Sequence, residues 1–170
     1  GKGAVVAAAP KGAAGFLFTV FQVLPQAYGV TPPPGVIISG YQPPQAIIGA
    51  AFGQFRNRDI RVLASRPDAG AGASCAASIG RPCEAADLAV SWTSPEGVAC
   101  VGGFKVLNAR PNLAGQWFTL IAGAWGPASD LARHLPVLAH VAGSFAINDA
   151  YARRYVEQGI AHLREQQQRT

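Results

Sequence analysis

A pair of strands joined by a tight turn is the feature that most constrains the fold of this sequence. Over residues 87–93, every second side chain is bulky and apolar: Leu88, Val90 and Trp92. That period of two is typical of a strand with one buried face. The next residues, Ser94-Pro95-Glu96-Gly97, place proline and glycine where a type I turn favours them. The pattern predicts a β-hairpin whose second strand covers 98–108, with a bulge at Gly102-Gly103.

Further strands are predicted by runs of β-branched and aromatic residues on both sides of the hairpin. These runs cover residues 16–24, 36–41, 60–65 and 116–125. In the run over 60–65, Ile60, Val62 and Ala64 alternate with Arg61, Leu63 and Ser65, so we expect a half-buried strand there. Because several of these strands follow one another through short turns, the sequence predicts an antiparallel meander.

Two regions change to a helical period. A helix is expected to begin at Pro43-Pro44, since proline is tolerated in the first turn, and its apolar face would carry Ile48, Phe52 and Phe55. After Gly126-Pro127, apolar residues recur three or four positions apart, at Leu131, Leu135, Leu138, Ala142 and Phe145. Such a stripe is suited to lie on a sheet. We therefore predict an α+β fold, an antiparallel β-meander sheet with helices packed on one face.

The two ends of the chain are set apart from this domain. Residues 1–15 are rich in Ala, Gly and Pro and have no hydrophobic period, which predicts a flexible or partner-ordered arm. We assign 16–148 to a single α+β domain and 149–170 to a C-terminal helical extension, an amphipathic helix. The sequence contains no methionine, so we expect it to begin after processing or inside a longer precursor.

Charged residues are scarce for a domain of this size. They make up 14% of the chain against 49% apolar residues, whereas soluble domains have about 25% charged residues. Because charged side chains usually cover much of a protein surface, the deficit predicts that other molecules cover part of this one. The net charge of +5 comes mostly from scattered arginines. They form no basic stripe interleaved with aromatics, so we expect no nucleic-acid partner.

The three cysteines fit neither a zinc site nor a CxxC redox motif. Cys75 and Cys83 bracket a short stretch of small residues in a predicted loop over 67–82. This stretch can fold back and bring the two cysteines together in a disulfide. Bridges of this kind persist outside the reducing cytosol. The alternative is three buried free thiols. We favour the bridge, with Cys100 left over in a strand, and expect a periplasmic or secreted protein.

The sequence shows no arrangement of residues that indicates catalysis. His134 and His140 are six residues apart on a predicted helix, whereas a helical metal pair needs a spacing of three or four. No Gly-x-Ser-x-Gly motif is present, and the acidic residues are spread thinly. The segment 70–74 has glycines but lacks the Lys-Ser/Thr pair of a phosphate loop, so a flexible loop is expected there. We predict no enzymatic activity, no cofactor and no metal site.

Candidate partner-binding residues come from two places. Arg153 and Arg154 lie beside Tyr151 and Tyr155, and both residue types are enriched at interface cores. The alternative is an ordinary solvated helix face with its tyrosines on the core. Trp125 precedes Gly-Pro at the end of a strand, where we expect it to be partly exposed, and an exposed tryptophan commonly marks an interface. Trp92, by contrast, is expected in the core.

Both ends of the chain resemble a known family. Phe18-Thr19-Val20, leading to Pro25-Gln26-Ala27-Tyr28, is similar to the opening of PsbP-like domains, the extrinsic subunits of photosystem II and their bacterial lipoprotein relatives. The strand at 117–124, followed by Leu135-Pro136-Val137-Leu138 and Ser144-Phe145, resembles the ending of the same superfamily.

Two departures accompany this resemblance. The prolines at 32–34 interrupt a region where the family usually has more strand, and the extension over 150–169 continues past the usual ending. The resemblance implies an extracytoplasmic, non-enzymatic module that docks on membrane complexes or stays near a membrane. It supplies no catalytic residues.

The sequence thus predicts a non-catalytic accessory subunit or docking module of an extracytoplasmic, membrane-associated multiprotein assembly. Its partners would be protein subunits of a larger complex or further copies of the chain, bound through the N-terminal arm, the last helix or both. The alternative is a domain that binds a small apolar ligand or a lipid. Its pocket would lie between sheet and helices, lined by Phe52, Phe55, Trp117 and Phe145.

Overall fold

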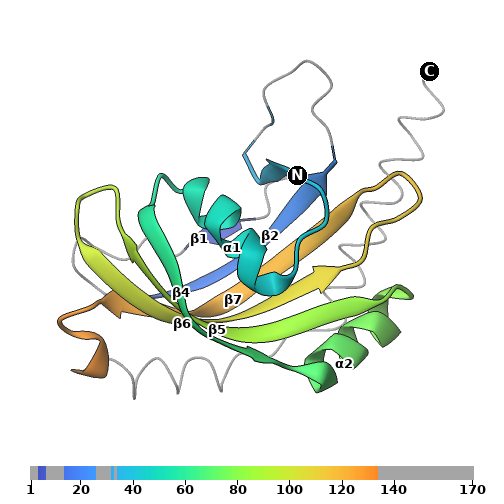
Figure 1. The fold of residues 1–170 in the computed structure, drawn as a ribbon. Helices are drawn as coiled ribbons and strands as arrows, with labels where there is room; N and C mark the ends of the chain where they lie inside the picture. The colour runs from blue at the N-terminus through green and yellow to red at the C-terminus, as the bar shows by residue number, and fades with distance from the viewer. Residues whose placement is uncertain (1–3, 7–13, 26–31, 33, 134–170) are drawn as a thin grey trace. The chain divides into compact units, whose positions relative to one another are not determined.

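The predicted hairpin lies in the middle of a mixed α+β structure (Figure 1). The computed structural model describes residues 4–6, 14–25, 32 and 34–133. The two hairpin strands are β5 (Cys83–Thr93) and β6 (Ala99–Ala109), which pair antiparallel without a register shift. The turn between them is closed by hydrogen bonds from the Gly97 N–H to the Ser94 carbonyl and from the Ser94 N–H to the Val98 carbonyl.

The other strands extend the hairpin on both sides. They are β1 (Ala4–Val6), β2 (Gly15–Leu24), β3 (Val36–Ile38), β4 (Arg58–Pro67) and β7 (Trp117–Pro127). The order across the sheet is β1-β2-β7-β6-β5-β4, and every neighbouring pair in it is antiparallel. The short β3 pairs parallel with β2.

Helix α1 (Pro44–Gly53) covers one face of this sheet, with Pro44 in its first turn as predicted. The ring of Phe52, only 1% exposed, meets the rings of Trp92 and Phe104 edge-on, each with its centroid 5.1 Å away. The residues predicted to face inward from the first hairpin strand are buried there. These three aromatic residues belong to the hydrophobic core.

Helix α2 (Ala69–Ile79) occupies the segment for which the sequence analysis expected a loop. Asp68 caps its first turn by accepting a hydrogen bond from the Ala71 N–H, and Gly80 ends it at a φ of 66°. Glycine adopts that left-handed conformation at no steric cost. The loop prediction over 67–82 was therefore wrong, and the glycines of 70–74 lie inside a helix.

The two helices pack on opposite faces of the sheet, which corrects the expectation of helices on one face (Figure 1). Successive side chains of a strand point to opposite faces. On β6, Phe104 contacts Phe52 of α1, whereas the neighbouring Lys105 bonds to Asp68 at the start of α2. We call these the α1 face and the α2 face.

Glycines allow β6 and β7 to pack closely, and they do not form the predicted bulge. A Cβ on Gly102 would lie 2.7 Å from the carbonyl oxygen of Ala124, and one on Gly123 would overlap the carbonyl oxygen of Gly103. The register of β6 is continuous along both its neighbours. The bulge prediction at Gly102-Gly103 was wrong, since both residues pair in register with β5 and β7 and Gly102 serves close packing instead.

Other sequence predictions met with mixed results. The strands expected over 16–24 and 116–125 are β2 and β7. The strand expected over 36–41 is shorter, and Ala4–Val6, within the predicted arm, pairs with β2. The amphipathic stripe after Gly126-Pro127 lies largely outside the described residues, which include its first helical turn at residues 131–133.

Candidate functional site

Strand β4 is the most open element among the described residues. It lies at the end of the sheet, where β5 is its one neighbour among the described strands. Nine of its ten residues are exposed, including Leu63 at 58% and Val62 at 36%. The sequence predicted a half-buried strand over 60–65. That prediction was wrong because a terminal strand is flanked on one side alone.

Three arginines of β4 point to the α2 face. Arg58, Arg61 and Arg66 stand opposite Thr93, Ser91 and Asp87 of β5, which are all odd-numbered positions of one strand. Residues two apart on a strand share a face, so the three arginines share the α2 face despite two register shifts in β4. The edge of the sheet therefore carries three arginines on this face, together with the carboxylate of Asp59, which accepts a hydrogen bond from the Thr93 hydroxyl.

A cleft of about 490 Å³ opens at the C-terminal end of β4. It lies between the first turns of α1 and α2, and its lining combines prolines with small and polar residues: Pro43, Pro44, Gln45, Ser65, Pro67, Asp68, Ala69, Gly72, Cys83, Glu84, Ala85 and Ala86. Its two ionisable groups are Asp68 and Glu84. The partners of these carboxylates decide what chemistry the cleft supports.

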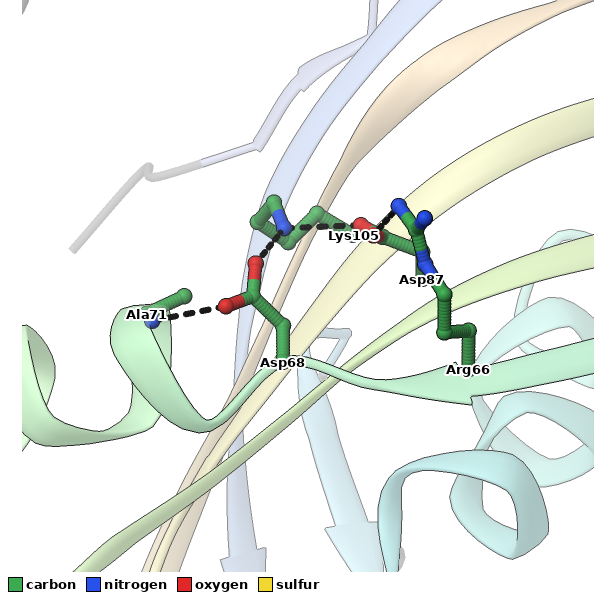
Figure 2. Close-up of polar contacts among 5 residues, drawn as sticks. All are labelled: Arg66, Asp68, Ala71, Asp87 and Lys105. Atoms are coloured by element: carbon green, nitrogen blue, oxygen red, sulfur yellow. Dashed lines mark hydrogen bonds and ion pairs between the residues drawn. The ribbon is translucent and has the colours of Figure 1, made fainter.

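Asp68 belongs to a cluster of charges on the α2 face, shown in Figure 2. One oxygen accepts a hydrogen bond of 2.9 Å from the Ala71 N–H, and the other pairs with the Lys105 ammonium. Lys105 also donates to Asp87 at 2.7 Å, and Asp87 pairs with Arg66 at 2.9 Å. The cluster joins β4, α2, β5 and β6.

Each group in this cluster is held in its charged form. The pKa of Asp68 is lowered, first by the bond from Ala71 and then by Lys105; that of Asp87 is lowered by Lys105 and Arg66. Desolvation opposes the charge on Lys105, but its bonds to Asp68 and Asp87 outweigh it and raise the lysine pKa. A general acid or base works best with a pKa near the ambient pH. The pKa shifts of Asp68, Asp87 and Lys105 keep these groups charged at neutral pH, which suits ion pairs that hold α2 against the sheet and not proton transfer.

The second acid of the cleft, Glu84, is also paired. It forms an ion pair with Arg110, whose guanidinium lies 4.6 Å from the ring centroid of Tyr41. Burial, followed by the nearby Glu84, raises the pKa of Tyr41. The tyrosine ring in turn packs on Trp117 at 5.1 Å between centroids. The phenol thus stays neutral at physiological pH, and both cleft carboxylates are neutralised by cations.

The described ranges contain neither a metal-binding cluster nor a membrane-spanning helix. Among those residues, no three His, Cys, Asp or Glu side chains are arranged to hold a metal ion. No helix in the same part of the chain is long and apolar enough to cross a membrane. The three histidines lie outside the described residues.

The predicted cysteine pair is brought together. Cys75 of α2 and Cys83 of β5 lie at disulfide distance, with their Cα atoms 6.0 Å apart. This geometry is compatible with the predicted bridge. Cys100 lies buried in β6 as a free thiol, and burial raises its pKa.

The predicted partner-binding residues divide into one that the structure places and four that it does not. Trp125, at the end of β7, is half-buried, and its ring centroid lies 5.9 Å from that of Trp92. Its role in binding stays a prediction. The others, Tyr151, Arg153, Arg154 and Tyr155, lie outside the described residues.

The aromatic residues predicted to line an apolar ligand pocket pack mainly against one another. Phe52 and Trp117 are almost fully buried, and Phe55 is a half-buried neighbour of Phe21, at 5.9 Å between ring centroids. None of them lines the cleft beside β4. Phe145 lies outside the described residues, and the ligand-binding alternative stays a prediction.

The open edge at β4 was not predicted from the sequence. Its signal was present in the arginines at 58, 61 and 66, which interrupt a run of strand-forming residues. Charged side chains are a common feature of edge strands, because they discourage unwanted pairing.

No family model, curated protein or solved structure matches this chain.

Proposed function

We propose that this protein is a non-catalytic accessory subunit or docking module of an extracytoplasmic, membrane-associated multiprotein assembly. The observation that carries the proposal is β4, a strand of ten residues at the end of the sheet with nine of them exposed. An open edge presents unpaired N–H and C=O groups, which are a ready template for another chain. A partner seated on this edge would satisfy those groups and cover Leu63.

The proposed location outside the cytosol is supported by the cysteine pair. A bridge between Cys75 and Cys83, which lie at disulfide distance, would persist in an oxidising compartment. The low share of charged residues, 14% of the chain, supports a surface that is partly covered by a partner.

The finer architecture belongs to the same proposal. Strands β4 to β7 would form the meander of a PsbP-like domain, and the residues after Arg133 would supply its closing amphipathic helix. The apolar stripe that begins at Leu131 supports this arrangement. Such a domain would act by position and contact, as a subunit held close to a membrane complex.

The size of the protein in its native extract tests the docking function. The full chain, released under gentle conditions and sized by gel filtration with light scattering, is expected in a particle well above its own 17.6 kDa. The purified chain at several concentrations is the control, since it shows whether the particle is a self-assembly. A native extract containing the monomer alone, even after mild cross-linking in situ, would contradict the proposal.

A further inference from the structure

The edge of the sheet also indicates the chemistry of the partner. We propose that the outer edge of β4 binds an extended acidic segment of another protein, which adds to the sheet as a further strand. This inference rests on the proposed docking function. It adds where the partner binds, in which conformation and with which side chains.

The backbone of β4 is available for such pairing. β4 (Arg58–Pro67) is bonded to β5 on its inner side, and within the described residues no backbone hydrogen bond is formed by its outer side. In an antiparallel pair, alternate residues direct their N–H and C=O groups to one neighbour. The remaining residues of β4 therefore direct theirs outward, as in domains that bind peptides by strand addition.

The charges of β4 favour an acidic occupant, since its three arginines outnumber its one carboxylate, Asp59. Arg58 and Arg61 share the α2 face, and neither forms an ion pair in the described part of the chain. Arg66, on the same face, is already paired with Asp87. An added strand would place its own side chains beside Arg58 and Arg61, where carboxylates stabilise the pairing and cations oppose it.

On the opposite face of β4, the α1 face, we expect the partner segment to carry apolar side chains. Val62 stands opposite the buried Val90 on the α1 face, yet it is 36% exposed because none of the described strands lies outside it. Leu63, at the register shift, is 58% exposed. The matching segment therefore alternates, with carboxylates on one face and β-branched or aromatic residues on the other.

A second copy of this chain fits the edge poorly. Pairing of two β4 strands would bring Arg58 and Arg61 of both copies to one face, and like charges opposite one another are destabilising. The net charge of +5 adds repulsion between copies and attraction toward acidic proteins. The occupant that the charges favour is a different, acidic chain.

The cleft limits where the acidic residues of the partner lie. A strand that continues past Pro67 enters the cleft of about 490 Å³, whose lining includes Asp68 and Glu84. These two carboxylates are already paired with Lys105 and Arg110, and the described lining holds no cation that an acidic side chain of the partner could bind. We therefore expect the acidic positions at the Arg58–Arg61 end of β4 and uncharged residues at the cleft end.

Three synthetic peptides of about ten residues test the mode of binding. One alternates Glu and Val, one alternates Lys and Val, and one is the Glu-Val peptide with N-methyl groups on alternate amides. Fluorescence anisotropy with the purified full chain at neutral pH should show the Glu-Val peptide binding at least about tenfold more tightly than either control. Hydrogen exchange should show new protection of amides in β4. Equal binding of the Glu-Val and Lys-Val peptides, or of the methylated and unmethylated ones, would overturn the inference.

Charge reversal on the edge tests the side-chain assignment. Arg61→Glu should weaken the Glu-Val peptide about tenfold and strengthen the Lys-Val peptide, because one attraction is replaced by a repulsion. Arg133→Glu makes the same change of net charge at an exposed residue beyond β7 and should leave both affinities unchanged. Arg61→Lys keeps the charge and should keep binding. Equal effects of Arg61→Glu and Arg133→Glu would show general charge attraction and would refute a site on β4.

The same variants separate this inference from the docking function. If the native particle persists with Arg61→Glu and the peptides do not bind, the protein docks through another surface and the β4 inference fails alone. If no particle exists, the docking function fails, whatever the peptides do. If Arg61→Glu dissociates the native particle and Arg133→Glu does not, both proposals stand.

Discussion

Helix α1 and helix α2 pack on opposite faces of the same strands by different means. On the α1 face, Phe52 is enclosed by Trp92 and Phe104, and the contacts are almost entirely apolar. On the α2 face, the helix is joined to the sheet by the Asp68–Lys105 ion pair and by cysteines at disulfide distance. α2 buries little, since Gly72 is its one fully buried residue.

The two faces show how a chain with few charged residues distributes them. Apolar burial is non-directional and proportional to area, so the α1 face supplies most of the stability of the fold. Ion pairs with more than a third of a side chain exposed contribute little energy, but they fix where a small helix lies. We therefore expect large losses of stability from changes on the α1 face and smaller, condition-dependent losses from changes on the α2 face.

The largest effect is expected from Phe52→Ala. Removing a fully buried aromatic ring costs about 3–5 kcal/mol of unfolding free energy, because transfer energy is lost and a cavity remains. Denaturant unfolding of both proteins measures the difference. Leu113→Ala is the control, since that leucine is fully exposed in the turn after β6 and should change the free energy by less than about 0.5 kcal/mol. Similar small losses in the two variants would show that α1 does not complete the core.

The next effect concerns the cysteine pair on the α2 face. Cys75→Ala with Cys83→Ala should lower the unfolding free energy by about 2–3 kcal/mol, because the bridge closes a short loop in the unfolded chain. The residues are eight positions apart. A thiol reductant should lower the stability of the natural chain and leave the double variant unchanged. The double variant is the control, because it keeps the free thiol of Cys100 and lacks the two cysteines of the bridge. Insensitivity of the natural chain to reductant would argue against a bridge.

Substitution of two adjacent glycines of β6 compares packing on the α1 face with packing on the α2 face. Gly102→Ala should cost about 1–3 kcal/mol, because its Cβ would lie 2.7 Å from the Ala124 carbonyl oxygen and must displace backbone. Gly103→Ala should be neutral or slightly stabilising, since its Cβ would meet no atom within 4 Å. Thermal and denaturant unfolding of the pair measures this contrast. Equal losses would mean that strand conformation, and not packing on one face, sets the cost.

Much of the sheet could be predicted because its signal is local. Alternation in β5 and the turn at 94–97 specify a hairpin from a short stretch of sequence, and β2 and β7 are continuous runs of strand-forming residues. The mixed α+β class followed from these strands and from the helix that begins at Pro44. The pairing of Cys75 with Cys83 was also a local inference.

What could not be predicted depends on contacts distant in sequence. Helix α2 has no apolar stripe, so a hydrophobic period could not reveal it, although Asp68 and Gly80 are a good cap and stop. The ion pairs of Lys105 join residues 37 and 18 positions away. The exposure of β4 follows from its place at the end of the sheet, which the sequence of one strand does not specify.

The smallest effect is the dependence of stability on pH through the α2 face. Folding lowers the pKa of Asp68 and Asp87, so both carboxylates favour the folded state above their ordinary pKa of about 3.9. That contribution is lost as the pH falls through the lowered values in the folded protein. Lys105→Met should bring both pKa values closer to those of the unfolded chain and flatten the acid side of a plot of melting temperature against pH. Parallel curves for the two proteins below about pH 4 would show that the cluster does not couple protonation to folding.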